Sequence, residues 1–191
     1  MPTFRESDLT FHFPRHWYVR RYDQQPFYLR MSGLGLKGVD FVALDPLGTG
    51  HLYLIEVKNY RTRQTASGTY LAHDVSPEEL AQATAVKFEH TQRAIRAVQL
   101  HYRRQWWYRL AHRYWQTSKR YQQTTVFWTK AFQCLQDAAL HTHVLWLETE
   151  EPNSEFEKTV RQVISYELET GSSFAITNTE REALPGLVVT R

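Results

Sequence analysis

The feature that most constrains the fold is a pair of apolar segments, residues 39–44 and 51–58, on either side of a turn-forming stretch. Residues 45–50 have the sequence Asp-Pro-Leu-Gly-Thr-Gly, in which proline fixes φ and glycines supply unusual backbone angles. We therefore predict two strands joined as a β-hairpin. Because side chains alternate along a strand, Glu56 and Lys58 should lie on one face, with Ile55 and Val57 on the other.

The predicted hairpin brings together three ionisable groups that lie in or beside apolar strands, where charges are rarely found without a partner or a function. If the hairpin is symmetric about Gly48, Asp40 lies opposite Glu56 at its open end. Two adjacent carboxylates repel each other unless a cation separates them. We therefore predict a Mg²⁺ or Mn²⁺ site held by Asp40 and Glu56, helped by the Val57 carbonyl. Lys58 would be the catalytic partner of this metal.

Two sequence strings carry a resemblance to a known family: Gly-Val-Asp-Phe at 38–41 and Ile-Glu-Val-Lys-Asn-Tyr-Arg at 55–61. An acid at a strand start, a hairpin and then Glu-x-Lys resembles the PD-(D/E)XK nuclease superfamily, which includes restriction endonucleases and Holliday-junction resolvases. The resemblance implies a restriction-endonuclease-like fold, with a mixed four-stranded core sheet flanked by helices. It also implies Mg²⁺-dependent cleavage of nucleic acid.

The chain departs from the family pattern at several positions. Val39 replaces the proline that gives the motif its name. Many members carry a further glutamate before the hairpin, for which Glu6 and Asp23 are the candidates here. Some members use a glutamine on the helix after the hairpin, and Gln82 is the residue that we assign to that role.

The order of predicted elements indicates an α/β (α+β) protein in one domain, residues 1–191. After the hairpin, Ser76-Pro77-Glu78-Glu79 is a strong helix start. The helical pattern from 76 to 139 forms a long insertion rich in basic and aromatic residues. A strand at 144–147, a helix from Asn153 or Ser154 and strands at 174–177 and 187–190 follow. This order favours a mixed sheet of four to six strands flanked by helices.

Charge is distributed unevenly along the chain. The net charge is +3, yet residues 86–120 contain nine basic residues and one acid, Glu89, which leaves 14 basic and 19 acidic residues elsewhere. Such a basic segment favours a polyanionic partner, and its interleaved aromatic rings could stack on unpaired bases. Alternatively, the rings pack in the core beneath solvated arginines, or they form a dimer contact. The candidate nucleic-acid-binding residues are Arg61, Arg63, Arg93, Arg96, Arg103, Arg104, Arg109 and Arg113.

Composition excludes several other classes of protein. Hydrophobic residues make up 42% and charged residues 23% of the chain, a globular composition without a run of 18 apolar residues. The polar N-terminus and the lone Cys134 fit a cytoplasmic protein. We expect Cys134 to be a small buried residue, and His141 and His143 to be packed or surface histidines. The glycines at 33–38 lack the following helix that a dinucleotide fingerprint requires.

Two functions from different classes are compatible with these patterns. The first is a metal-dependent nuclease that acts on DNA in preference to RNA. The second is a catalytically inactive nucleic-acid-binding or scaffold module on the same fold, whose acidic patch is degenerate or structural. For the charged motif itself, the alternative to a metal site is a cross-strand ion pair on an exposed sheet face. A weaker third hypothesis is a protein that binds other proteins through its Trp-rich helix. Nucleic acid is the expected partner, a homodimer or partner protein is compatible, and a membrane is not expected.

Overall fold

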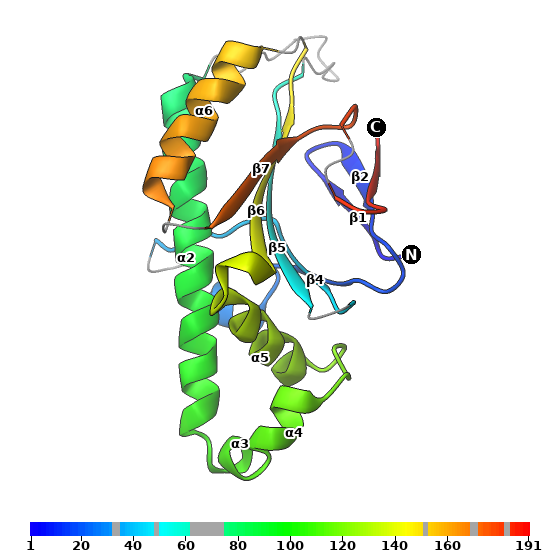
Figure 1. Ribbon diagram of the computed structural model, residues 1–191, viewed down its shortest axis with the longest axis vertical. Coiled ribbons are helices and arrows are strands. Elements are labelled where there is room, and N and C mark those ends of the chain that lie inside the picture. Colours follow the sequence, from blue (N-terminus) through cyan, green and yellow to red (C-terminus); the bar gives the residue numbers. More distant parts are fainter. Residues whose placement is uncertain (32–34, 48–49, 62–74, 151–152, 169–171, 182–183) are drawn as a thin grey trace.

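Two β-sheets and a layer of helices make up the computed structural model, which describes residues 1–31, 35–47, 50–61, 75–150, 153–168, 172–181 and 184–191 (Figure 1). The larger sheet has the order β3-β4-β5-β6-β7 and the smaller sheet has the order β1-β2-β8. The strands of the larger sheet are β3 (Tyr18–Arg21), β4 (Phe41–Asp45), β5 (His51–Asn59), β6 (His141–Glu148) and β7 (Ser173–Thr177). Those of the smaller sheet are β1 (Thr3–Glu6), β2 (Leu9–His12) and β8 (Val188–Thr190).

The larger sheet is mixed, as predicted. Strands β3, β4 and β5 are antiparallel, whereas β5, β6 and β7 are parallel. Parallel neighbours need a crossover, and helices supply both of them. Between β5 and β6 lie α2 (Pro77–Arg104), α3 (Trp106–Leu110), α4 (His112–Thr117), α5 (Thr124–Leu135) and the short 3₁₀ helix η2 (Ala138–Leu140). Helix α6 (Ser154–Glu167) joins β6 to β7, and α1 (Pro26–Met31) lies between β3 and β4.

The helix starts follow the predicted capping residues. The Ser76 hydroxyl accepts a hydrogen bond from the Glu79 N–H at 3.2 Å, and the Asn153 side chain accepts one from the Phe156 N–H at 3.0 Å. The basic segment is not one continuous helix, because Gln105 has extended backbone angles that end α2. None of the helices in the described part of the chain combines the length and hydropathy needed to span a membrane.

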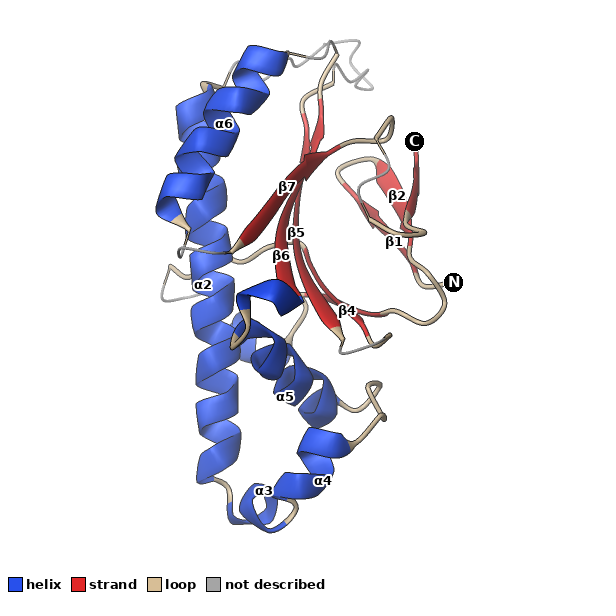
Figure 2. Ribbon diagram, viewed as in Figure 1, coloured by secondary structure: helices blue, strands red, loops and turns tan. Residues whose placement is uncertain are grey.

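The predicted hairpin register is confirmed. Phe41 pairs with Ile55, so Asp40 lies opposite Glu56, while turn residues Gly48 and Thr49 lie outside the described residues. The predicted alternation also holds: Leu52 and Leu54 pack with the helices, and Ile55 and Val57 pack toward the smaller sheet. Contrary to the hypothesis of an exposed ion-pair face, both faces of the larger sheet are covered, one by helices and the other by the smaller sheet (Figure 2).

The two histidines of β6 are packed side chains, in agreement with the sequence analysis. Both are buried on the helix-covered face, and Nε2 of His143 lies 2.6 Å from the Gln92 side-chain nitrogen. If the Gln92 amide donates to Nε2, the ring proton sits on Nδ1, which faces the Ser173 carbonyl at 3.3 Å. Burial, assisted by the neighbouring His141, lowers the pKa of His143 to about 4. Cys134 is also buried, as expected.

This depressed pKa predicts a loss of stability in mild acid. The unfolded chain binds a proton at His143 near its ordinary pKa of 6.5, whereas the folded chain resists it down to about 4. The contribution of His143 to the free energy of unfolding is therefore largest above pH 6.5, and it falls by about 3 kcal/mol as the pH drops to 4. Urea unfolding at pH 7.0 and 5.0 measures the effect. The variant His143→Asn, which cannot be protonated, should lose less stability between these pH values than the wild type, and an equal loss would contradict this assignment.

Candidate active site

Asp40 and the end of β5 form the structural centre of the candidate site. The Asp40 carboxylate accepts a hydrogen bond from the Val57 N–H at 2.7 Å, and its own N–H donates to the Ile55 carbonyl at 3.1 Å. Strand β4 begins at Phe41, so its backbone pairing with β5 does not extend to Val57. The Asp40 side chain accepts the hydrogen bond from the Val57 N–H instead. Asp40 is consequently fixed beside the β5 segment that carries Glu56 and Lys58.

Glu56 is the most deeply buried charge in this group. Its side chain has no exposed surface, and its Oε1 lies 2.8 Å from Nζ of Lys58 and 2.6 Å from Nζ of Lys87. The other oxygen, Oε2, is buried and has no hydrogen-bond partner among the described residues. An ionised oxygen without a partner is costly to bury, so this atom is the one most in need of a further ligand.

Lys87 is a site residue that the sequence analysis did not identify. It lies on the same side of α2 as the buried Thr84 and Thr91, one turn before and one turn after it. In the sequence, Lys87 could have been identified because it shares a helix face with residues that pack against the sheet. The predicted Gln82 is exposed and lies about 140° around the helix axis from Lys87, so it is not brought to the site.

Helix α2 also fixes the segment that leads into β4. The Thr91 hydroxyl accepts a hydrogen bond from the Val39 N–H at 3.1 Å and donates one to the Lys87 carbonyl at 2.8 Å. At Gly38 an added Cβ would lie 2.1 Å from the Tyr22 ring, so only glycine allows this close approach. Asp40 is therefore positioned both by the hairpin and by contacts to the helix that carries Lys87.

Burial and neighbouring charges shift the ionisation of the cluster. Burial, then the Glu56 carboxylate, raises the pKa of Asp40 to about 7, although Lys87 and the Val57 N–H act in the opposite direction. For Lys58, burial alone would lower the pKa, but its contacts with Glu56 outweigh that effect and raise it. The Glu56 carboxylate thus opposes ionisation of Asp40, and an added cation would relieve this repulsion.

The candidates for a third acid differ in their placement. Glu6 pairs with Arg21 at 2.9 Å, and it is close enough to contribute to the raised pKa of Asp40. Asp23 pairs with the same arginine at 3.4 Å and is half exposed. Glu148, at the end of β6, is a buried acid that the sequence analysis missed. Its position in the strand directs it to the other face of the sheet, so it cannot join Asp40 and Glu56.

The oxygen atoms of the site are of the kind that a hard divalent cation binds. Asp40 and Glu56 supply carboxylate oxygens, including the unpartnered Oε2. Because the Ile55 carbonyl faces β4, the Val57 carbonyl two residues later faces the same side. Mg²⁺ commonly retains several waters, so these few oxygens fit it. Among the described residues, however, no group of three or more His, Cys, Asp or Glu side chains could hold a metal ion.

The predicted nucleic-acid-binding arginines fall into two groups. Some have local partners: Arg61 pairs with Glu148 at 3.2 Å, Arg93 pairs with Glu89, and Arg96 contacts Gln92 at 3.4 Å. A guanidinium–ring contact also places Arg103 over Phe132. Arg63 lies outside the described residues. The second group is Arg104, Arg109 and Arg113, which are exposed.

The second group surrounds the turn that joins α2, α3 and α4, and we refer to residues 103–115 as the basic tip (Figure 1). From the sequence, aromatic rings could either pack in the core or remain available to stack on bases, and the basic tip contains both a buried and an exposed ring. Tyr108 is fully buried, and its hydroxyl accepts a hydrogen bond from the Gln99 amide and forms another with the Thr129 hydroxyl. Trp106, in contrast, is 72% exposed beside the arginines. The tip therefore presents both cations and a free aromatic ring to solvent.

Comparisons with known proteins identify no relative. No family model matches the chain, and neither the curated proteins nor the solved structures include a significant match.

Proposed function

We propose that the chain is a metal-dependent nuclease that hydrolyses phosphodiester bonds in nucleic acid, with DNA as the preferred substrate. The observation that carries this proposal is the convergence of Asp40, Glu56 and Lys58 on one face of the sheet, with a buried Glu56 oxygen that no described residue hydrogen-bonds. The resemblance of these strands to the PD-(D/E)XK superfamily and its restriction-endonuclease-like fold supports the same activity.

Each side chain has a role in this proposal. Asp40, Glu56 and the Val57 carbonyl hold Mg²⁺ or Mn²⁺, which when bound lowers the pKa of a water and polarises a phosphoryl oxygen. The Val57 N–H keeps Asp40 oriented toward the ion. The Lys58 side chain is 27% exposed, so its ammonium group can contact a substrate while it remains paired with Glu56. It orients the attacking water or stabilises negative charge that develops on the phosphate.

One observation favours the alternative of an inactive nucleic-acid-binding or scaffold module. Lys58 and Lys87 together balance the charges of Asp40 and Glu56 without any metal. Such a balanced cluster could serve the fold alone, since buried charges are usually paired. A nuclease requires in addition that the cluster bind a divalent ion.

The decisive experiment measures cleavage of supercoiled plasmid, linear duplex, single-stranded DNA and RNA with Mg²⁺, Mn²⁺ or EDTA. The proposal predicts cutting that needs the metal and disappears in Asp40→Ala and Lys58→Ala. Binding of Mn²⁺, followed by isothermal titration calorimetry, should be lost in Asp40→Ala. Nucleic-acid binding that persists with neither metal binding nor cleavage would favour the scaffold instead.

The basic tip predicts a salt-sensitive contribution to substrate binding. Arg104 lies about 26 Å along the axis of α2 from Lys87, a distance of about eight base-pair steps of duplex. Replacing Arg104, Arg109 and Arg113 together by alanine should weaken binding of duplexes longer than this and reduce the salt dependence of log K by about one unit for each lost phosphate contact. Fluorescence anisotropy across a salt series measures both effects. An unchanged slope would remove the tip from the nucleic-acid interface.

A further inference from the structure

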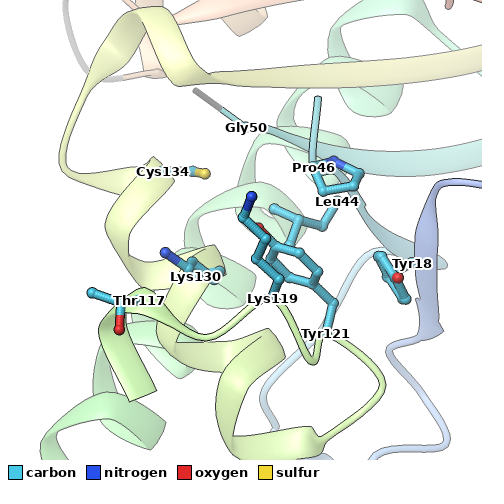
Figure 3. A pocket seen from close by; sticks show the side chains of 9 residues that line it. All are labelled: Tyr18, Leu44, Pro46, Gly50, Thr117, Lys119, Tyr121, Lys130 and Cys134. Atoms are coloured by element: carbon cyan, nitrogen blue, oxygen red, sulfur yellow. The ribbon is translucent and has the colours of Figure 1, made fainter. Parts of the chain in front are cut away.

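A cavity of about 470 Å³ lies at the turn end of the β4–β5 hairpin, away from Asp40 and Glu56 at the open end (Figure 3). Its walls come from three parts of the fold: β3 and the hairpin, the segment that follows α4, and α5. Figure 3 shows side chains from these three places facing a common space. Its volume lies in the range of small-molecule binding sites in proteins, about 300–1,000 Å³.

One side of the cavity is positively charged. Lys119 and Lys130 both line it, and none of the described residues that line it is acidic. Neither lysine forms an ion pair with an acid in the described part of the chain, and the Lys130 ammonium donates to the Gln116 carbonyl. Burial lowers the pKa of Lys130, which means that its charge is incompletely solvated. The carboxylate of the nearby Asp45 already has other partners: it accepts a hydrogen bond from the Leu47 N–H at 3.0 Å and lies 3.5 Å from the His16 ring. An anion would therefore be stabilised here.

Another part of the cavity wall is aromatic and apolar. The rings of Tyr18 and Tyr121 lie with their centroids 5.0 Å apart at an interplanar angle of 33°, and Leu44 and Pro46 continue this wall. Both tyrosines are only partly buried, so they are accessible to a ligand. A flat ring fits such a wall because aromatic contacts favour offset or tilted arrangements.

We propose that this cavity binds a nucleoside phosphate, with the phosphate between Lys119 and Lys130 and the base against Tyr18 and Tyr121. Inorganic phosphate alone would leave the aromatic wall unused, and an apolar ligand would leave two lysines without a counter-ion. The ligand is either a free nucleotide or the phosphorylated end of a strand, which present the same chemistry. This site is separate from Asp40 and Glu56 and does not depend on the nuclease activity.

Isothermal titration calorimetry in EDTA with AMP, adenosine, inorganic phosphate and a 5′-phosphorylated dinucleotide tests the proposal. AMP should bind, while adenosine and inorganic phosphate should each bind at least about tenfold more weakly, because each retains one half of the contacts. Stronger binding of the dinucleotide than of AMP would identify a strand end as the ligand, and weaker binding would identify the free nucleotide. Failure of both phosphorylated ligands to bind at millimolar concentrations would overturn the proposal.

Matched variants locate the binding. Lys119→Met and Lys130→Met should each weaken AMP binding about tenfold or more, whereas Lys158→Met, an exposed lysine on α6, should not change it. Lys119 is exposed, so its replacement tests the site even if Lys130→Met disturbs the packing of α5. Equal AMP affinity in the wild type and the Lys119→Met variant would refute the assignment, as would AMP binding that is lost in Lys58→Met instead.

Discussion

Replacement of Asp40 by asparagine is expected to reduce metal-dependent cleavage by about a thousandfold, because the proposed metal site would lose a carboxylate ligand. The same change should stabilise the fold at pH 8. The folded-state pKa of about 7 lies above the ordinary value of 3.8, so the folded chain binds more protons between these values and loses stability as the pH rises through them. Asparagine removes this ionisation and can still accept from the Val57 N–H.

The net gain in stability should be about 2 kcal/mol at pH 8, because desolvation of the neutral amide offsets part of the benefit. Near pH 4, where Asp40 is protonated in the wild-type fold, this gain should be gone and only the desolvation penalty of the amide should remain. Cleavage assays and urea unfolding measure the two effects. Asp8→Asn is the matched control, since the Asp8 side chain is 55% exposed and its replacement should change neither quantity. An Asp40→Asn variant that is strongly destabilised at pH 8 would show that Asp40 is a structural charge.

The second large effect is expected when Lys58 is replaced by methionine, which keeps much of the side-chain volume. Lys58 and Lys87 contact the same Glu56 oxygen at 2.8 and 2.6 Å, and their side chains are 27% and 24% exposed. Each methionine variant therefore removes one partner of a buried acid and should lose about 2 kcal/mol of stability. Cleavage should fall at least about a hundredfold in Lys58→Met, because the proposed mechanism places the Lys58 ammonium group against the reacting phosphate or the attacking water.

Lys87→Met is the control for the lost ion pair, since it has the same structural defect without the proposed catalytic contact. Rates measured under conditions in which both variants are fully folded separate chemistry from stability. If Lys87→Met loses as much activity as Lys58→Met, the two lysines share the catalytic role. If Lys87→Met alone loses activity, Lys58 has been assigned wrongly.

The sequence predicted the hairpin well because local patterns determine it. The two apolar segments and the Pro- and Gly-containing turn between them define both the strands and their register, so the opposition of Asp40 and Glu56 followed directly. Helix starts at Ser76 and Asn153 were also predictable, since each capping group bonds to the backbone only a few residues away. Whether this sheet has the restriction-endonuclease-like fold stays a prediction.

Long-range placement was not predictable in the same way. Lys87 reaches Glu56 only because α2 packs across the sheet. The number of residues between positions 56 and 87 does not predict this contact. Strand β1 was missed because it joins β2 through Ser7 and Asp8, which both have positive φ without the usual Asn-Gly signature. Gln82 was misplaced because the helix phase was not known before the packed face of α2 was seen.

The parallel pairing of β5 with β6 has a consequence for the order of folding. These neighbours are joined by the entire segment from α2 to η2, and closing a connection of this length has an entropic penalty of about 4 kcal/mol. The β4–β5 hairpin and helix α2 can form from local contacts, whereas the β5–β6 ladder must wait for that closure. We therefore expect the β5–β6 ladder to form late in folding. Until β6 pairs with it, the edge of β5 is exposed and can pair with a strand of another chain.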